Sequence, residues 1–225
     1  MALTVYAWGA YATYNHRQIA YRDEDSQVYV MVQVAKGELT SRQFSYVTAL
    51  DGTRLRVSKD NPAAVHEIFG QYGACTLRLC RNSLIVPVPS SSHTVLGTPF
   101  TGSKLVDAIV KKLSPMANMQ ASPILAFDQV MPRASKGEAN GRDKTFIQSH
   151  LITKANSLQG INVILVDDVC TSGAHLLACA DYLRAKGATV ANAVCIGKTS
   201  PTQHPTPLAV KPEDIENPFS MFFQQ

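Results

Sequence analysis

The stretch Val163-Ile-Leu-Val-Asp-Asp-Val-Cys-Thr-Ser-Gly-Ala-His175 decides the fold. Its apolar start belongs to Ile161–Val166, a continuous apolar run that is typical of a strand buried on both faces. Asp167 and Asp168 follow this strand directly. Because ligands bind beyond the carboxyl ends of strands in open α/β sheets, the two carboxylates are candidate binding groups.

The small residues after the acids predict a phosphate-binding loop that leads into a helix. Backbone N–H groups of such a loop, together with the helix N-terminus, form a nest for an anion, and glycine permits close approach of the backbone. The predicted phosphate-binding residues are Thr171, Ser172, Gly173, Ala174 and His175. A phosphate nest beside two carboxylates that can bind hydroxyl groups or Mg²⁺ describes a site for a ribose 5-phosphate.

Strands and helices alternate along the chain on both sides of this motif, from residue 84 onward. Such strand–helix–strand units require parallel pairing of the strands, so we expect a parallel sheet flanked by helices. The predicted strands are Leu84–Val88, Ile124–Phe127, Ile161–Val166 and Thr189–Ile196. The predicted helices are Ser103–Leu113 and Ala174–Lys186.

The first 80 residues have a β-rich pattern. The valines of Gln27–Ala35 recur at every second position, which predicts a strand, and Asp51-Gly52 predicts a hairpin turn. Asn61-Pro62 predicts a helix start with Asn61 as N-cap, and Gly73 is expected to end that helix.

The predicted domain organisation has three parts. A β-rich hood or flap spans residues 1–80, with one helix near 62–72. An α/β core spans 81–199, and a Pro-rich tail spans 200–225.

Composition restricts the class of protein. The chain has 225 residues, of which 45% are hydrophobic, and 21 basic against 17 acidic residues. This mild positive balance fits a small anionic ligand, and without a dense Lys/Arg run we expect no nucleic-acid partner. The five scattered cysteines argue against a disulfide framework and for a reducing, cytoplasmic location. The sequence predicts neither a signal peptide nor a membrane span.

Residues 163–175 resemble the signature for phosphoribosyl pyrophosphate (PRPP) in type I phosphoribosyltransferases: four apolar residues, two acids and a Thr/Ser–Gly loop. The segment Leu84-Ile-Val-Pro-Val-Pro89 is similar to the first core strand of the ComF-like branch, without that branch's frequent N-terminal zinc element. Residues 133–145 lie where the family has a flexible loop over the active site. The resemblance covers about residues 84–199 and implies the phosphoribosyltransferase fold for them.

The resemblance also implies roles for individual residues. Asp167 and Asp168 would bind the ribose hydroxyls, directly or through the cofactor Mg²⁺, while residues 171–175 cradle the 5′-phosphate. The other implied substrate-binding residues are Ser90, Ser91, Arg142 and Lys144. His93 could touch pyrophosphate, but we expect this side chain in a surface loop.

The favoured function is transfer of a phosphoribosyl group from PRPP to an unidentified nitrogenous acceptor, with release of pyrophosphate. Two alternatives stay open. One is a non-catalytic sensor of PRPP or a nucleotide, which the uncharged loop Ser90–Ser92 favours. The other is a ribose-phosphate hydrolase or nucleotide-consuming effector. We expect no membrane partner, and a homodimer stays open.

A receiver domain also carries acids at a strand end. It needs an Asp and a Lys on later strands, however, whereas only one clear strand follows Asp168 in this chain. The receiver interpretation also leaves the glycine loop unexplained.

Overall fold

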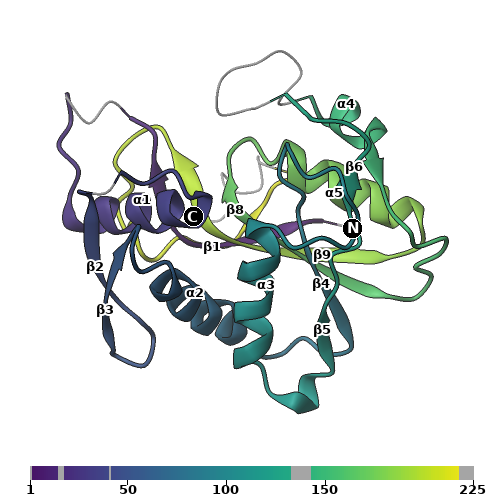
Figure 1. Cartoon of the computed structure of the whole chain (residues 1–225), viewed down its shortest axis with the longest axis horizontal. Helices are drawn as coiled ribbons and strands as arrows, with labels where there is room; N and C mark the ends of the chain where they lie inside the picture. The colour runs from purple at the N-terminus through teal and green to yellow at the C-terminus, as the bar shows by residue number, and fades with distance from the viewer. Residues whose placement is uncertain (1, 15–17, 41, 133–142, 218–225) are drawn as a thin grey trace.

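The computed structural model describes residues 2–14, 18–40, 42–132 and 143–217 (Figure 1). Its centre is a six-stranded sheet with the strand order β10-β1-β9-β8-β4-β5. These strands are β1 (Thr4–Ala12), β4 (Ser83–Pro87), β5 (Met119–Ala121), β8 (Asn162–Cys170), β9 (Thr189–Ser200) and β10 (Glu213–Asp214). All neighbouring strands pair in parallel except β1 and β10, which are antiparallel.

Helices cover both faces of the sheet, and two small sheets lie outside it. The helices are α1 (Asp23–Lys36), α2 (Ala63–Thr76), α3 (Thr101–Lys112), α4 (Lys144–Ser149) and α5 (Ala174–Ala185), with a short 3₁₀ turn at Pro115–Ala117. One small sheet pairs β2 (Phe44–Thr48) with β3 (Arg54–Ser58), and the other pairs β6 (Ala126–Phe127) with β7 (Leu151–Ile152).

The core has two layers, one on each face of the sheet. Apolar side chains of α1, α2, α3 and the β2–β3 hairpin form one layer, and those of α5, β6 and β7 form the other. In Figure 1, α5 accordingly lies above the sheet and α2 and α3 lie below it. In the described residues no helix is both long and apolar enough to cross a bilayer.

The predicted α/β architecture is confirmed, including a hairpin in the N-terminal region. Its two strands flank the turn at Asp51-Gly52, where Gly52 has a φ of 87°. The strand before the acids is longer than predicted, because β8 runs through them to Cys170.

The predicted strand Gln27–Ala35 is wrong, since these residues belong to helix α1. Val28, Val30, Val32 and Val34 are all buried. The helix packs on β1, β9 and β8 on one side and on β2, β3 and α2 on others. Because protein surrounds α1 on several sides, its apolar residues need not follow a single helical stripe, and here they mimic the two-residue period of a strand.

Three other local predictions are also corrected. The strand predicted at Ile124–Phe127 is only the short β6, and β5 takes the place in the main sheet. Gly73 does not end α2, which continues to Thr76; a Cβ at Gly73 would lie 2.5 Å from Ile109 Cγ1, so glycine allows α2 and α3 to approach. The side chain of Asn61 caps no helix but donates to the carbonyl oxygen of Arg56 at 2.9 Å.

Candidate active site

The carboxyl ends of β4 and β8 define a crevice in the sheet. The two strands are neighbours, yet α3, which follows β4, packs on one face, and α5, which follows β8, packs on the other. The chain therefore leaves β4 toward one face of the sheet and leaves β8 toward the opposite face. In open parallel sheets this topological switch point is where ligands bind.

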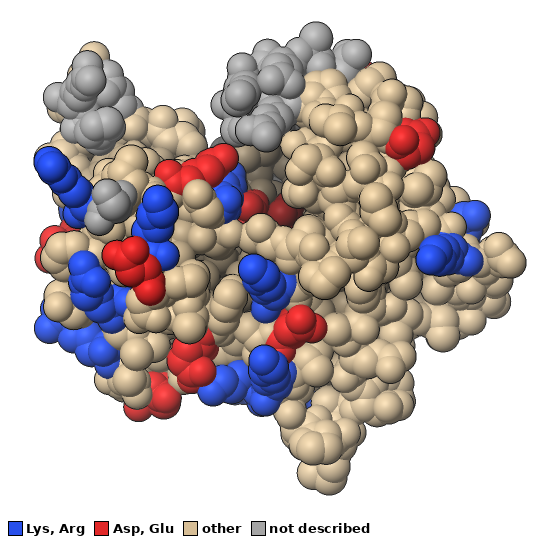
Figure 2. All heavy atoms as spheres, viewed as in Figure 1, with Lys and Arg blue, Asp and Glu red and all other residues tan. Residues whose placement is uncertain are grey.

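A pocket of about 300 Å³ occupies this crevice. In Figure 2 it is the hollow between the α1 side and the α5 side of the molecule, with acidic side chains inside it. The lining consists of Lys36, Glu38, residues 88–92, residues 100–102, Asp167, Asp168, Val169, Thr171 and His175. The structure thus brings together two acids, the loop after β4 and part of the predicted phosphate loop.

The two acids near the end of β8 lie close together and are partly buried. Burial raises the pKa of Asp167 well above its usual range, and the neighbouring Asp168 carboxylate raises it further. Burial also raises the pKa of Asp168, while Lys36 lowers it. The backbone N–H of Asp168 donates to Asp167 Oδ1 at 2.8 Å, which fixes that carboxyl group. Such a pair gains from a cation or from hydroxyl donors that enter the pocket.

The predicted phosphate loop forms the turn between β8 and α5. Gly173 is the N-cap of α5 with a φ of +79°, a conformation that favours glycine. A Cβ there would lie 2.9 Å from Ile215 Cδ1. Backbone conformation and packing against Ile215 therefore both favour glycine at this position, whether or not a phosphate approaches the turn.

Only some residues of this turn line the pocket. Thr171 and His175 do, whereas Ser172, Gly173 and Ala174 lie in the turn without lining it. Ser172 is exposed, and its Oγ accepts a hydrogen bond from the Ala174 N–H at 3.4 Å.

His175 is the second residue of α5, and its side chain is partly buried. Its Nε2 has no hydrogen-bond partner among the described residues, and the ring lies 6.3 Å from that of Phe127. Burial lowers the pKa of His175, which favours the neutral ring at pH 7. An unpaired ring nitrogen beside the pocket can accept a ligand hydroxyl or, once protonated, donate to a phosphate.

The loop after β4 supplies the opposite lining. Ser90 and Ser91 both line the pocket, as the predicted substrate-binding set requires. His93 differs from the expected surface residue: it is only 6% exposed, and its ring lies 4.0 Å from that of Phe100. The backbone N–H of His93 donates to the Ser90 carbonyl at 2.8 Å and so helps to fix the shape of this loop.

The end of α1 completes the pocket with residues that the sequence analysis missed. Gly37 has a φ of +72° and ends the helix, and the N–H of Glu38 donates to the Gln33 carbonyl at 2.9 Å. This reversal places Lys36 and Glu38 at the pocket. A Lys-Gly-Glu segment after a valine-rich run is the typical end of a helix, and it could have been recognised had that run been assigned as helical.

The remaining predicted residues lie elsewhere. Lys144 starts α4, and its Nζ lies 2.9 Å from Asp181 Oδ2 on α5. It is not among the residues that line the pocket. Arg142 falls outside the described residues.

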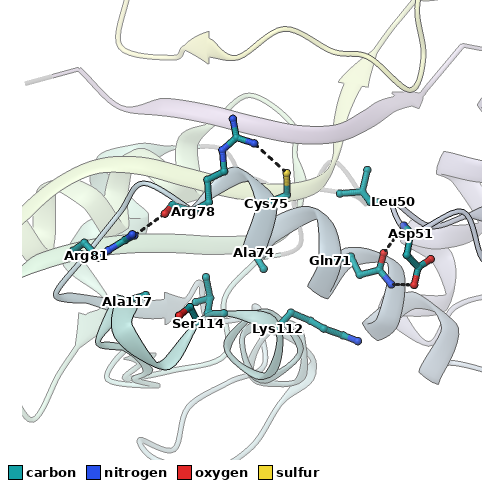
Figure 3. Close-up of a pocket in the computed structure, with 11 residues that line it drawn as sticks. Leu50, Asp51, Gln71, Ala74, Cys75, Arg78, Arg81, Lys112, Ser114 and Ala117 are labelled. Atoms are coloured by element: carbon teal, nitrogen blue, oxygen red, sulfur yellow. Dashed lines mark hydrogen bonds between the residues drawn. The ribbon is translucent and has the colours of Figure 1, made fainter.

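A second cavity, of about 520 Å³, lies far from the acids between α2, α3 and the hairpin turn (Figure 3). Its cationic side chains are used in local contacts. Arg78 points toward Cys75, Arg81 donates to the Arg78 carbonyl at 2.6 Å, and Lys112 lies 2.6 Å from Glu67. They stabilise the ends of α2 and α3 and do not converge on a ligand.

Comparison with known protein families identifies the domain to which these residues belong. A model of the phosphoribosyl transferase domain matches residues 90–223, more than half of the chain. The match includes the β4 loop, the two acids and the turn into α5. No curated protein matches the chain.

Three solved structures resemble the chain distantly. UMP synthase of Leishmania donovani has a TM-score of 0.38 and 15% identity over 79% of this chain and 32% of its own, so this chain spans about a third of that protein. Orotate phosphoribosyltransferase of Mycobacterium tuberculosis H37Rv, in complex with Fe(III) dicitrate, has a TM-score of 0.37 and 13% identity, covering 76% of this chain and 87% of its own. A hypoxanthine phosphoribosyltransferase from Staphylococcus aureus has a TM-score of 0.34 and 12% identity, covering 61% and 74%.

The family assignment thus rests on the domain match, and the switch-point pocket gives it a physical basis. The matched residues include Asp167 and Asp168 near the end of β8 and the turn that leads into α5. The chain therefore belongs to the phosphoribosyl transferase domain family.

Proposed function

We propose that this protein transfers the 5-phosphoribosyl group of PRPP to a nitrogenous acceptor and releases pyrophosphate. One observation carries the proposal: the switch-point pocket joins Asp167 and Asp168 to Thr171 on one side and to Ser90 and Ser91 on the other. A ribose can lie over the acids while its two phosphate-bearing ends reach these loops. Within the family, the segment Leu84–Pro89 favours the ComF-like branch, and the free cysteines favour a reducing compartment.

The proposed chemistry needs positioning more than covalent participation. The turn before α5 holds the 5′-phosphate, which is remote from the reacting carbon and so fixes its position. Asp167 and Asp168 accept hydrogen bonds from the ribose hydroxyls. Positive charge then develops at C1′ beside these carboxylates, which stabilise it as the bond to pyrophosphate breaks.

The donor set fits a Mg²⁺ ion that is carried partly by substrate. The described residues contain no cluster of three or more His, Cys, Asp or Glu side chains able to hold a metal. Two carboxylates nevertheless suffice for Mg²⁺, which usually keeps several waters and binds substrate phosphates. Asp167 and Asp168 would hold the ion. When bound, Mg²⁺ would neutralise charge on the leaving pyrophosphate.

A sensor without turnover remains a second candidate because the pocket has few cationic groups. Of the described residues that line it, only Lys36 is a lysine or arginine. PRPP carries a pyrophosphate that normally requires more charge compensation. A pocket that binds ribose 5-phosphate but stabilises the leaving group weakly would suit recognition better than catalysis.

The two functions are separated by incubating the protein with PRPP, Mg²⁺ and a panel of purine, pyrimidine and amide acceptors. Pyrophosphate release reports transfer, and calorimetry with PRPP alone reports binding. If the protein is a transferase, pyrophosphate is released only when a particular acceptor is present. Binding without release by any acceptor would support the sensor.

The Asp167→Asn/Asp168→Asn variant tests the site itself. It should bind PRPP more weakly by about 2–5 kcal/mol, because charged acceptors for the hydroxyls or the ion are lost. Asp107→Asn is the matched control, since Asp107 is exposed on α3. Unchanged PRPP affinity in a folded double variant would contradict the proposed site.

A further inference from the structure

A separate basic pocket adjoins the PRPP pocket. It has a volume of about 260 Å³ and lies where the end of α1 meets the starts of α2 and α3. Its polar side chains come from segments far apart in the sequence, namely Lys36, Lys59, His66, Thr101 and Lys104. Neither the proposed transfer nor the family resemblance uses Lys59, His66 or Lys104.

The charge of this pocket has one sign. Among the described residues that line it there is no Asp or Glu, while Lys36, Lys59 and Lys104 contribute three ammonium groups. Within the described part of the chain, none of these lysines forms an ion pair. In Figure 2 blue side chains gather over the α1, hairpin and α2 side of the molecule, with red acidic side chains among them.

The cationic groups act on one another inside this cluster. Burial lowers the pKa of His66, and the charges of Lys104 and Lys111 lower it further. His66 is therefore expected to be neutral at pH 7 and able to donate or accept one hydrogen bond. Like charges that converge on a hollow repel each other, and an anion in that hollow relieves the repulsion.

The two pockets share residues. Lys36 and Thr101 line both, so the basic pocket opens beside the acids and the loop after β4. The backbone at Thr101 begins α3, a helix of 12 residues, whose N-terminal N–H groups add to the positive potential. A ligand held over Asp167 and Asp168 can therefore extend past Lys36 toward Lys59 and Lys104.

We propose that this basic pocket is an anion subsite that binds a phosphoryl group next to the ribose site. The pocket has a volume of about 260 Å³, close to the 300 Å³ of the neighbouring pocket. Ammonium groups without carboxylate partners suit phosphate, which ammonium groups bind as point charges. Anion binding by itself does not depend on the proposed function.

The identity of the molecule that carries the phosphoryl group rests on the proposed function. Two molecules can supply such a group. It can be the pyrophosphate end of PRPP, for which the uncharged Ser90–Ser92 loop supplies little compensation. Alternatively it can belong to a phosphorylated acceptor that enters from the α2 side. Binding experiments separate the two.

The test uses the Lys59→Gln/Lys104→Gln variant, which leaves the shared Lys36 and Thr101 intact. Its control is Lys154→Gln/Lys211→Gln, which removes the same charge from exposed positions outside both pockets. Calorimetry measures the binding of inorganic pyrophosphate, ribose 5-phosphate and PRPP to each protein. We expect the first variant to bind pyrophosphate about tenfold more weakly, and the control to bind like the wild type.

The affinity of the variant for PRPP shows which molecule supplies the phosphoryl group. If PRPP weakens about tenfold while ribose 5-phosphate does not, the subsite holds the pyrophosphate end. If PRPP is unaffected, but binding of inorganic phosphate to the PRPP-saturated protein is lost, the subsite holds a group from the acceptor.

Pyrophosphate and phosphate affinities that match the wild type in folded Lys59→Gln/Lys104→Gln would overturn the subsite. Failure of the proposed function has a different signature. Wild-type protein would then bind neither ribose 5-phosphate nor PRPP, while the pyrophosphate arm would still report on the basic pocket.

Discussion

The two walls of the candidate site are built in different ways. One wall is contiguous in sequence, because Asp167, Asp168, Thr171 and His175 follow each other from β8 into α5. The opposite wall collects Lys36 from α1, Ser90 from the loop after β4 and Thr101 from α3. The first, contiguous wall carries the paired aspartates, whereas the second, assembled wall carries Lys36 together with Glu38.

The contiguous wall is built from local features that many ribose-phosphate sites can share, whereas the assembled wall is specific to the way this chain folds. A strand end, two acids and a turn into a helix are local devices whose geometry follows from short-range backbone chemistry. The second wall depends on how α1 crosses the sheet. That helix packs closely because Gly9 on β1 leaves room for Val28, where any Cβ would overlap. Substrate specificity is therefore expected to follow the assembled wall.

Among the single substitutions in the two walls, the largest effect is expected from Gly173→Val in the contiguous wall. The variant combines a strained φ of +79° with a Cβ 2.9 Å from Ile215 Cδ1. We expect a loss of about 1–3 kcal/mol in the free energy of unfolding and at least a tenfold loss of ribose 5-phosphate affinity. Denaturant titration and calorimetry measure the two quantities.

Gly160→Val is the matched control for Gly173→Val. Gly160 has a φ of +74°, but nothing lies within 4 Å of an added Cβ, and it is not among the pocket-lining residues. Its cost should be strain alone, with ribose 5-phosphate affinity retained. If both variants lose affinity equally, the turn before α5 has no special part in phosphate binding.

A smaller effect is expected from Lys36→Gln in the assembled wall. Lys36 lowers the pKa of both Asp167 and Asp168, so it lies close enough to attract anions at the pocket. We expect PRPP affinity to fall about three- to tenfold and the salt dependence of binding to become weaker. Ribose 5-phosphate, which lacks the pyrophosphate, should lose less.

The comparison between PRPP and ribose 5-phosphate decides how Lys36 acts. An equal loss for both ligands would mean that Lys36 acts through the acids and not through pyrophosphate. Lys154→Gln serves as the control, because Lys154 is exposed and does not line the pocket.

Sequence reasoning found the contiguous wall because its signals are local. The apolar run before Asp167 predicts a buried strand, and the Thr-Ser-Gly turn after the acids predicts a helix start. These two elements are β8 and α5. The β2–β3 hairpin was predictable for the same reason, since Asp51-Gly52 specifies the turn. The glycine requirement at 173 was anticipated, but its cause, Ile215, is remote in sequence and could not be.

The assembled wall was missed because its signals depend on tertiary context. In α1 the valines alternate as they would in a strand, and only the sheet below and the hairpin above explain why all of them are buried. Once that segment was assigned as a strand, Lys36 had no reason to lie near the acids. His93 was likewise misjudged, since Phe100, which covers its ring, comes from the other end of the loop.

A smaller effect of opposite sign is expected from Asp167→Asn on stability. The folded-state pKa of Asp167 is raised by burial and by Asp168, so the folded protein holds a proton that the unfolded chain releases first. As pH rises above the ordinary aspartate pKa, the wild type therefore loses stability up to the raised pKa. Asn keeps the acceptor for the Asp168 N–H without the charge.

The Asp167→Asn variant should accordingly be more stable than the wild type at pH 7, by on the order of 1 kcal/mol, and its stability should depend less on pH. Urea titrations from pH 4 to 8 in metal-free buffer measure this, roughly spanning the range above the aspartate reference pKa. A more stable variant would show that the charged carboxyl group of Asp167 lowers the free energy of unfolding of the wild type. A less stable variant at pH 7 would instead mean that the carboxylate supports the fold.

The smallest effect is expected from His175→Thr. Burial lowers the pKa of His175, and its Nε2 has no partner within the described residues. A bound phosphate dianion favours imidazolium and so raises that pKa, whereas the N-terminus of α5 opposes a cation. The imidazolium form therefore binds phosphate better, and wild-type affinity for ribose 5-phosphate should fall as pH rises between the pKa values of the free and bound states. We expect a change of no more than about threefold, because the two influences compete.

Replacement by threonine should flatten this pH dependence while keeping the backbone N–H at the start of α5. Affinity measured from about pH 5 to 8 for both proteins gives the answer, since that range brackets the reference histidine pKa of about 6.5. Phosphate titrates in the same range, so the ratio of the two affinities at each pH is the quantity that matters. A ratio that stays constant would mean that His175 contributes its backbone and its packing against Phe127, and that the pH response of the contiguous wall comes from its two acids alone.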